Sequence, residues 1–113
     1  MIETLVGLHV VDAEVYAEYR RRMTPLLQSV GGGFRYDFEI SQTLKAETPE
    51  TINRLFIITF PNPKAREEFF KDSTYLEIKQ ALFERGVAAT TIIAEYSRGS
   101  ENQSEEEANS TRS

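Results

Sequence analysis

The most continuous apolar pattern in the chain lies at residues 52–60, which read INRLFIITF. Apolar side chains fall on both faces of the strand that this segment predicts, with Phe56, Ile58 and Phe60 on one face and Leu55 and Ile57 on the other. A strand that is apolar on both faces belongs in the middle of a sheet. Because each face of that sheet needs a cover, this one segment predicts layers on both sides.

Three further segments alternate with the period of a strand. They cover residues 2–11, 34–41 and 88–96. Segment 34–41 alternates apolar with charged or polar residues, which fits an edge strand better than a central one. The sequence therefore predicts four strands, of which segment 52–60 is the third.

Helical spacing appears in two regions, one between the first and second predicted strands and one between the third and fourth. Asp12 is a candidate cap, and an apolar stripe follows at Val15, Tyr16, Tyr19 and Met23. Pro25 predicts a kink or a break in this helix, which should end at the glycines 31–33. The second region begins at the cap Asn62, is interrupted at residues 72–74 and stops at Gly86.

The resulting order, β-α-β-β-α-β, predicts a ferredoxin-like α+β fold. Its four-stranded antiparallel sheet has the order 4-1-3-2, and both helical regions cover one face. The other face would carry Leu5, Leu55, Ile57 and Ile93. Since an exposed apolar sheet face is typical of an interface, we expect a homodimer in which two sheet faces pack together.

Several short segments together resemble a known family. They are the strand end Val10-Val11-Asp12, the helix Tyr16–Arg20, the stop Gly31-Gly32, the strand end Phe60-Pro61, and Tyr75 with Ile78-Lys79. As a set they resemble the DUF 1330 family, a family of unknown function in the dimeric α+β barrel superfamily. The resemblance covers residues 2–97 and implies a ferredoxin-like protomer whose sheet packs on that of a partner. Superfamily members include cofactor-independent monooxygenases, haem-degrading enzymes, lactone isomerases and ligand-binding domains, so the resemblance leaves the activity open.

Composition excludes several classes of function. The chain has 113 residues, 13 basic and 18 acidic, with a net charge of -5, which argues against nonspecific nucleic-acid binding. Without cysteine and with a single histidine, it offers no thiolate chemistry and no two-histidine metal motif, so we expect no metal and no cofactor. The apolar run at residues 5–11 is too short to span a membrane. A cytoplasmic protein is the expectation, with one domain at residues 1–97 and a disordered acidic tail at 98–113.

Two residues are candidates for proton transfer. The alternation of the first strand places His9 on the face away from the helices, and the same alternation places Asp37 on that face. A carboxylate beside an imidazole would make an acid–base pair. The structural alternatives are a strand histidine bonded to a neighbour and a carboxylate in a salt bridge.

Four residues are candidates for ligand binding between the helices and the sheet. Tyr16, Tyr19 and Tyr75 would line a pocket there, unless they serve only as core aromatics. Arg54 opens the central strand on the same side and would hold an anion, unless it is a solvated strand-end arginine.

Two functions follow as hypotheses. The first is a homodimeric binding protein whose pocket selects a small apolar or aromatic metabolite. The alternative is a cofactor-independent monooxygenase or isomerase-type enzyme that uses His9 or Asp37 for proton transfer. The single histidine has no partner fixed by spacing, which favours the binding protein.

Overall fold

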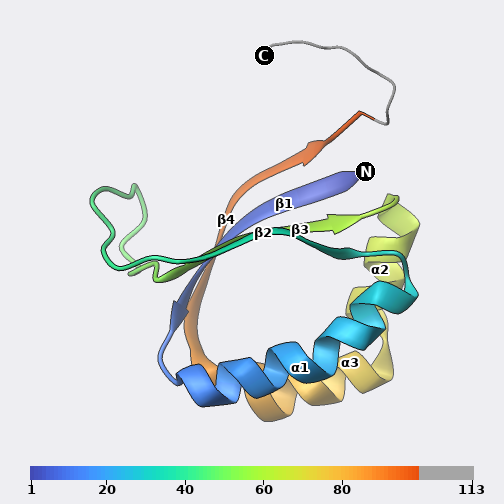
Figure 1. Ribbon diagram of the computed structural model, residues 1–113, viewed down its shortest axis with the longest axis horizontal. Coiled ribbons are helices and arrows are strands. Elements are labelled where there is room, and N and C mark those ends of the chain that lie inside the picture. Colours follow the sequence, from blue (N-terminus) through green and yellow to red (C-terminus); the bar gives the residue numbers. More distant parts are fainter. Residues whose placement is uncertain (100–113) are drawn as a thin grey trace.

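The computed structural model describes residues 1–99, and its elements follow the predicted order (Figure 1). The four strands are β1 (Ile2–Val10), β2 (Gly33–Glu39), β3 (Arg54–Phe60) and β4 (Val87–Ser97). The helical segments are α1 (Ala13–Ser29), α2 (Pro63–Lys71), α3 (Ser73–Ile78), the π-helix η1 (Lys79–Phe83) and α4 (Glu84–Gly86). The predicted tail lies outside the described residues from residue 100 onward.

The strands form one antiparallel sheet in the order β2-β3-β1-β4, which is the predicted order read from the other edge. Ile57 of β3 pairs with Leu5 of β1, so the two apolar strands occupy the centre. Figure 1 shows the helices on one side of the curved sheet, and the long connection between β2 and β3 extends from its far end. We call the sheet face that points toward the helices the inner face and the opposite one the outer face.

Three irregularities change which side chains reach each face. The pairing of β2 with β3 shifts between Phe34 and Tyr36, and the pairing of β4 with β1 shifts by one residue at Ile93 and again at Ala88. A bulge of this kind inserts one residue and reverses the alternation beyond it. Asp37 consequently lies on the inner face, so the prediction that it shares a face with His9 is wrong. Glu95 is moved to the inner face in the same way, where its carboxylate lies 3.5 Å from the Thr4 hydroxyl.

Helix α1 begins at its predicted cap, where the Asp12 carboxylate accepts a hydrogen bond from the Val15 amide. It continues through Pro25 without a break, so of the two predicted outcomes the break is wrong, and Figure 1 shows the helix bending instead. Gly31 follows with a φ of 83°, the left-handed conformation that ends helices. At Gly32 an added Cβ would lie 2.6 Å from the Leu27 side chain, so glycine lets the chain turn closely against the helix.

The second helical region changes direction where the sequence predicts an interruption. Asp72 ends α2, and its carboxylate accepts a hydrogen bond of 2.8 Å from the Tyr75 amide at the start of α3. Beyond Ile78 the chain continues as a π-helix before α4 leads into β4. A π-helix is wider than an α-helix and recurs at functional sites, so the side chains of this segment are candidates for a functional site.

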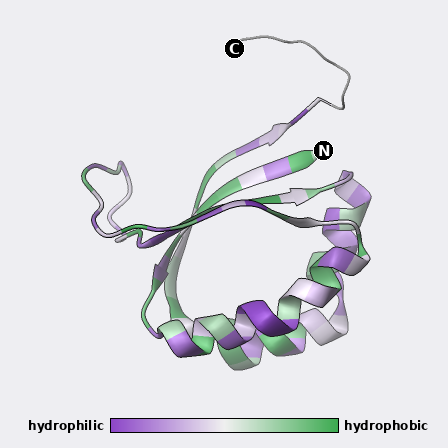
Figure 2. Cartoon of the chain, viewed as in Figure 1, coloured by the Kyte–Doolittle hydropathy of each residue, from purple (hydrophilic) through white to green (hydrophobic). Residues whose placement is uncertain are grey.

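The hydrophobic core fills the space between the inner face and the helices. Its most buried side chains include Leu8, Tyr16, Leu27, Phe60 and Phe69. Figure 2 shows hydrophobic segments along the strands and mixed polarity along the helices, as expected for helices that bury one side. Within residues 1–99, no helix has the length and apolar character needed to cross a membrane.

On the outer face, within residues 1–99, the Ile52 side chain packs over Gly7 of β1, but the surface toward β2 stays partly exposed. Tyr36 and Phe38 stand there with about half of their surface exposed, at 49% and 48%, and their rings stack 5.9 Å apart. They border a shallow groove with the half-buried side chains of Leu5, Leu55 and Ile57. Since these side chains come from three neighbouring strands, they form one apolar surface.

Candidate functional site

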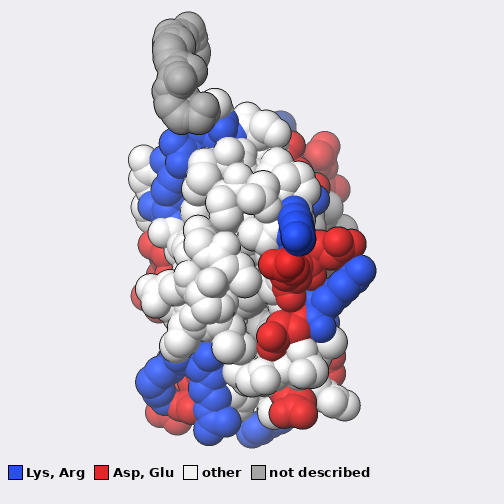
Figure 3. Space-filling model, turned by 90° about the vertical axis from the view of Figure 1, so that its right-hand side faces the viewer, with Lys and Arg blue, Asp and Glu red and all other residues white. Residues whose placement is uncertain are grey.

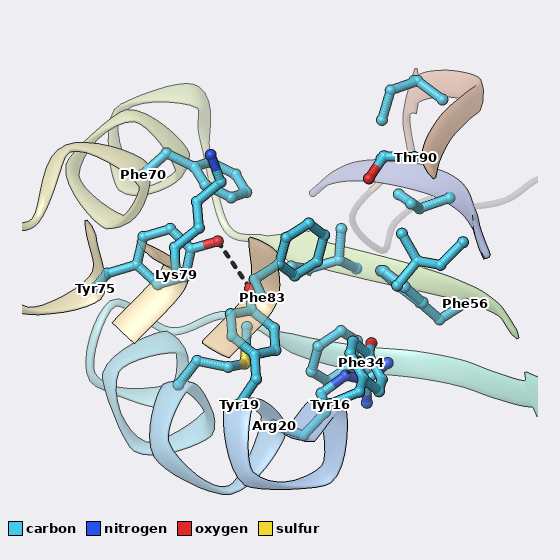
Figure 4. A pocket seen from close by; sticks show the side chains of 15 residues that line it. Tyr16, Tyr19, Arg20, Phe34, Phe56, Phe70, Tyr75, Lys79, Phe83 and Thr90 are labelled. Carbon is cyan, nitrogen blue, oxygen red and sulfur yellow. Dashed lines mark hydrogen bonds between the residues drawn. The ribbon is translucent and has the colours of Figure 1, made fainter. Parts of the chain in front are cut away.

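A cavity of about 350 Å³ lies between the inner face and the helices (Figure 4). We call it the central cavity. Most of its wall is aliphatic or aromatic, and the polar groups come from Arg20, Lys79, Thr90 and three tyrosines. Its lining comprises Val6, Leu8, Tyr16, Tyr19, Arg20, Met23, Phe34, Phe56, Ile58, Phe70, Tyr75, Lys79, Phe83, Thr90 and Ile92. A mostly apolar cavity with few polar groups is typical of small-molecule sites.

Two of the predicted ligand-binding residues meet inside this cavity. The hydroxyls of Tyr19 on α1 and Tyr75 on α3 lie 2.8 Å apart and share a hydrogen bond, drawn as a dashed line in Figure 4. Only 5% and 3% of these residues is exposed, and burial raises the pKa of both hydroxyls. Both therefore stay neutral at physiological pH and act as hydrogen-bond donors and acceptors.

Tyr16 and Arg54 meet at one end of the cavity wall. The Arg54 guanidinium lies 5.1 Å from the centre of the Tyr16 ring, while the Tyr16 hydroxyl accepts a bond of 2.7 Å from Arg20. Arg20 also lies 3.8 Å from the centre of the Phe34 ring. The contact of Arg54 with the Tyr16 ring and that of Arg20 with the Phe34 ring are cation–π interactions, which hold both arginines against aromatic rings. Tyr16 lines the cavity, whereas Arg54 stands behind it.

Asp37 joins the two arginines from the edge strand. Its carboxylate accepts hydrogen bonds from Arg20 at 3.0 and 3.3 Å and from Arg54 at 2.9 Å twice. Burial by itself raises the pKa of Asp37, but the bonds from Arg54 and Arg20 outweigh it and hold that pKa below its usual value. Asp37 is thus a firmly ionised bridge between α1 and β3 and a weak proton acceptor near neutral pH.

His9 lies away from the central cavity. It stands between Leu8 and Val10 on β1, and both of these neighbours pack into the core on the inner face. His9 therefore points to the outer face, half-buried, beside Ala89 of β4. The structure separates it from Asp37 by the thickness of the sheet, so the two do not form an acid–base pair.

Sequence reasoning overlooked Lys79. This lysine opens the π-helix and lines the cavity between Tyr75 and Phe83, each four residues away. The spacing of four along the chain was a usable signal, because residues at that spacing share one helix face. A charged residue on an otherwise apolar stripe is easily taken for a solvent-facing position.

Sequence reasoning also overlooked Glu3. Its side chain has no exposed surface and accepts bonds from Arg35 at 2.7 Å and from Arg98 at 2.9 Å. Burial raises the pKa of Glu3, but hydrogen bonds from Arg35, Tyr96 and Arg98 lower it by more. The cluster ties β1 to β2 and to the end of β4 on the outer face. Its partners lie far apart in sequence, so spacing alone gave no signal for it.

Within residues 1–99, neither clustered acidic groups nor the surface charge seen in Figure 3 indicates a second binding site. Across residues 1–99 no group of three or more His, Asp or Glu side chains is placed to hold a metal ion. Figure 3 views the molecule from the right-hand side of Figure 1 and shows a broad uncharged area left of the centre, with acidic and basic side chains to its right and basic side chains above and below it. That view contains no continuous basic surface of the kind that nucleic acids need.

Comparison with known proteins decides the family. Residues 4–96 match the family described as "Domain of unknown function (DUF1330)". The chain belongs to this family. The match confirms the resemblance that the short segments predicted, and it includes all of the helices and all or most of each strand. No curated protein matches the chain.

Solved structures similar to this DUF1330 protein share its fold. A protein of unknown function from Rhodopseudomonas palustris is 22% identical with a TM-score of 0.70, over 81% of this chain and 78% of that one. A putative antibiotic biosynthesis monooxygenase from Deinococcus radiodurans is 18% identical with a TM-score of 0.51, over 93% and 99%. A protein from Arabidopsis thaliana is 13% identical with a TM-score of 0.58, over 88% and 97%. At these identities the likeness establishes the ferredoxin-like fold and leaves the chemistry to the site itself.

Proposed function

We propose that this DUF1330 protein is a homodimer that binds a small apolar or aromatic metabolite in the central cavity. The observation that carries the proposal is the cavity itself, about 350 Å³ between helices and sheet with a wall that is mostly aromatic or aliphatic. At roughly 30 Å³ for each water-sized group, that volume accommodates about a dozen non-hydrogen atoms. A ligand of that size is a single ring with a short side chain.

Access to the cavity supports binding rather than a sealed packing defect. Phe70 of α2 and Ile92 of β4 both line the cavity, yet 43% and 55% of their surface is exposed. The opening therefore lies between α2 and the edge strand β4. Exposed apolar side chains at a cavity mouth provide a surface that an apolar ligand covers on entry.

The outer face supports the homodimer. Tyr36, Phe38 and Ile93 are each about half exposed there, at 49%, 48% and 48%. A second copy offers the same apolar surface, so a two-fold contact covers both faces at once. The hydroxyls of Thr59 and Thr91, which lack hydrogen-bond partners among residues 1–99, also lie on this side of the sheet.

The enzymatic alternative finds less support. A general base must reach the substrate and must accept a proton near neutral pH. His9 is absent from the cavity wall, and Asp37 is held in the ionised state by Arg20 and Arg54. A monooxygenase or isomerase activity that relies on either residue therefore has no support from the cavity.

Isothermal titration with small aryl-alkyl compounds tests the binding function. We expect at least one compound of about a dozen non-hydrogen atoms to bind the wild type, and Thr90→Trp to abolish that binding because the indole fills the mouth. Ala88→Trp is the matched control, since Ala88 is exposed on the same strand and does not line the cavity. Equal binding to wild type and Thr90→Trp, or no binding to wild type, would refute the proposal.

A further inference from the structure

We propose that the ligand of the central cavity is a monocarboxylate with an apolar or aromatic body, and that Lys79 binds its carboxylate. The inference rests on the proposed binding function and specifies the charge of the ligand. It follows from three features of the cavity, which are a cation without a carboxylate partner among residues 1–99, a hydroxyl proton available for donation and an otherwise apolar wall.

The two cations of the cavity wall differ in their partners. Arg20 already has an anion, because its guanidinium donates to both oxygens of Asp37 and also to the Tyr16 hydroxyl. Lys79 is half-buried, and no carboxylate of residues 1–99 lies within 4.0 Å of its ammonium group. Since a partly desolvated charge without a partner is unfavourable, an anionic ligand would stabilise Lys79.

The position of Lys79 distinguishes it from the other helical lysines. In Figure 4 its side chain runs along the cavity wall past Tyr75 toward Phe70. By contrast, Lys64 is exposed, and Lys71 is 74% exposed and pairs with Glu67 at 3.1 Å. The π-helix places Lys79 on the same cavity wall as Tyr75 and Phe83, and the residue is half-buried there.

The tyrosine pair supplies a second group for an oxygen of the ligand. Two hydroxyls carry two protons, and the bond between Tyr19 and Tyr75 uses one of them. The other proton is free to be donated to an oxygen atom in the cavity. A carboxylate is therefore matched by one ammonium group and one neutral hydroxyl donor.

The rest of the wall limits the ligand to a single charge. Beyond Arg20 and Lys79 the lining is neutral, and most of it is hydrocarbon, including Leu8, Phe56 and Ile58. A phosphate ester or a dicarboxylate would bring a second negative charge into this surface without a partner, which is strongly unfavourable. A monocarboxylate with a ring or an alkyl chain fits both the charge and the wall.

Titration of matched acid and amide probes tests the inference. The probes are 3-phenylpropanoate and 3-phenylpropanamide, which have similar shapes and differ in charge. We expect wild type to prefer the acid by about tenfold to hundredfold, the range for a charge-assisted hydrogen bond. Lys79→Met should lose this preference while it still binds the amide, and the control Lys64→Met should retain it.

The contrary outcomes separate a failure of the charge inference from a failure of the binding function. Equal affinity of wild type for acid and amide would overturn the charge inference and leave the binding function intact. The inference is also overturned if Lys79→Met keeps the acid preference, or if it binds neither probe although its circular dichroism is native. Failure of wild type to bind either probe would count against the binding function itself, and this inference would fall with it.

Discussion

Replacement of Ile57 by aspartate tests the homodimer at its centre. On the outer face, Ile57 of β3 lies between Leu5 of β1 and Tyr36 of β2, its neighbours in the sheet register. In a two-fold contact of outer faces, the new carboxylate would be buried without a partner in both protomers. We expect Ile57→Asp to be monomeric or to aggregate, and wild type to be a dimer.

The magnitude follows from the exposed apolar surface. A fully covered aromatic side chain buries about 150–250 Å², so covering the exposed halves of Tyr36, Phe38 and Ile93 buries roughly 300 Å² per protomer. At about 25 cal/mol per Å², two protomers gain about 15 kcal/mol. Association costs about 4–15 kcal/mol. Further burial of the half-buried Leu5, Leu55 and Ile57 must therefore supply the rest of the free energy that makes the dimer stable. Two unpaired buried charges, at several kcal/mol each, exceed such a margin.

Size-exclusion chromatography with light scattering at micromolar concentration measures the result. The control is Leu76→Asp, which places the same charge at an apolar residue of α3 that is 46% exposed and lies on the helical layer. This variant should remain a dimer. A monomeric wild type, or a dimeric Ile57→Asp, would refute the reasoning that the outer face is the interface.

Two further predictions concern charged and titratable groups of the outer face. Glu3→Gln should lower the free energy of unfolding at pH 7 by about 1–3 kcal/mol, because Arg35 and Arg98 lose a charged partner. Since the folded-state pKa of Glu3 is lowered, its contribution is present above its unfolded pKa of about 4.3 and is lost as pH falls through the folded value. Thermal melts at several pH values should therefore decline less steeply in acid for the variant, and an identical pH profile would contradict this role. His9→Gln should leave ligand affinity unchanged in titrations, because His9 does not line the cavity; loss of binding in a folded variant would show that it acts there.

Much of the fold was predictable because it depends on local pattern. The alternation of residues 52–60 and the caps Asp12 and Asn62 are signals within one element, and the structure has the corresponding strand and both caps. The tyrosine stripe on the first helix likewise predicted that Tyr16 and Tyr19 face the sheet, where both are buried. Patterns of this kind need no knowledge of distant residues.

The candidate site was less predictable because bulges in β2 and β4 reverse the alternation. Counting every second residue placed Asp37 with His9, whereas the shift at Arg35 brings Asp37 to Arg20 and Arg54. A bulge depends on how two strands pair, so the alternation of one strand cannot reveal it. The shared hydrogen bond between Tyr19 and Tyr75 depends in the same way on the docking of two helices.

The most direct test of the central claim is the location of a bound ligand by NMR. Protein labelled at the methyl groups of Ile, Leu, Val and Met would be mixed with 3-phenylpropanoate, and contacts from the ring protons to the methyl groups would be recorded. Binding in the central cavity predicts nuclear Overhauser contacts to Leu8, Met23 and Ile58, which line it. Contacts confined to Leu5, Leu55 and Ile57, the residues of the outer-face groove, would contradict the account.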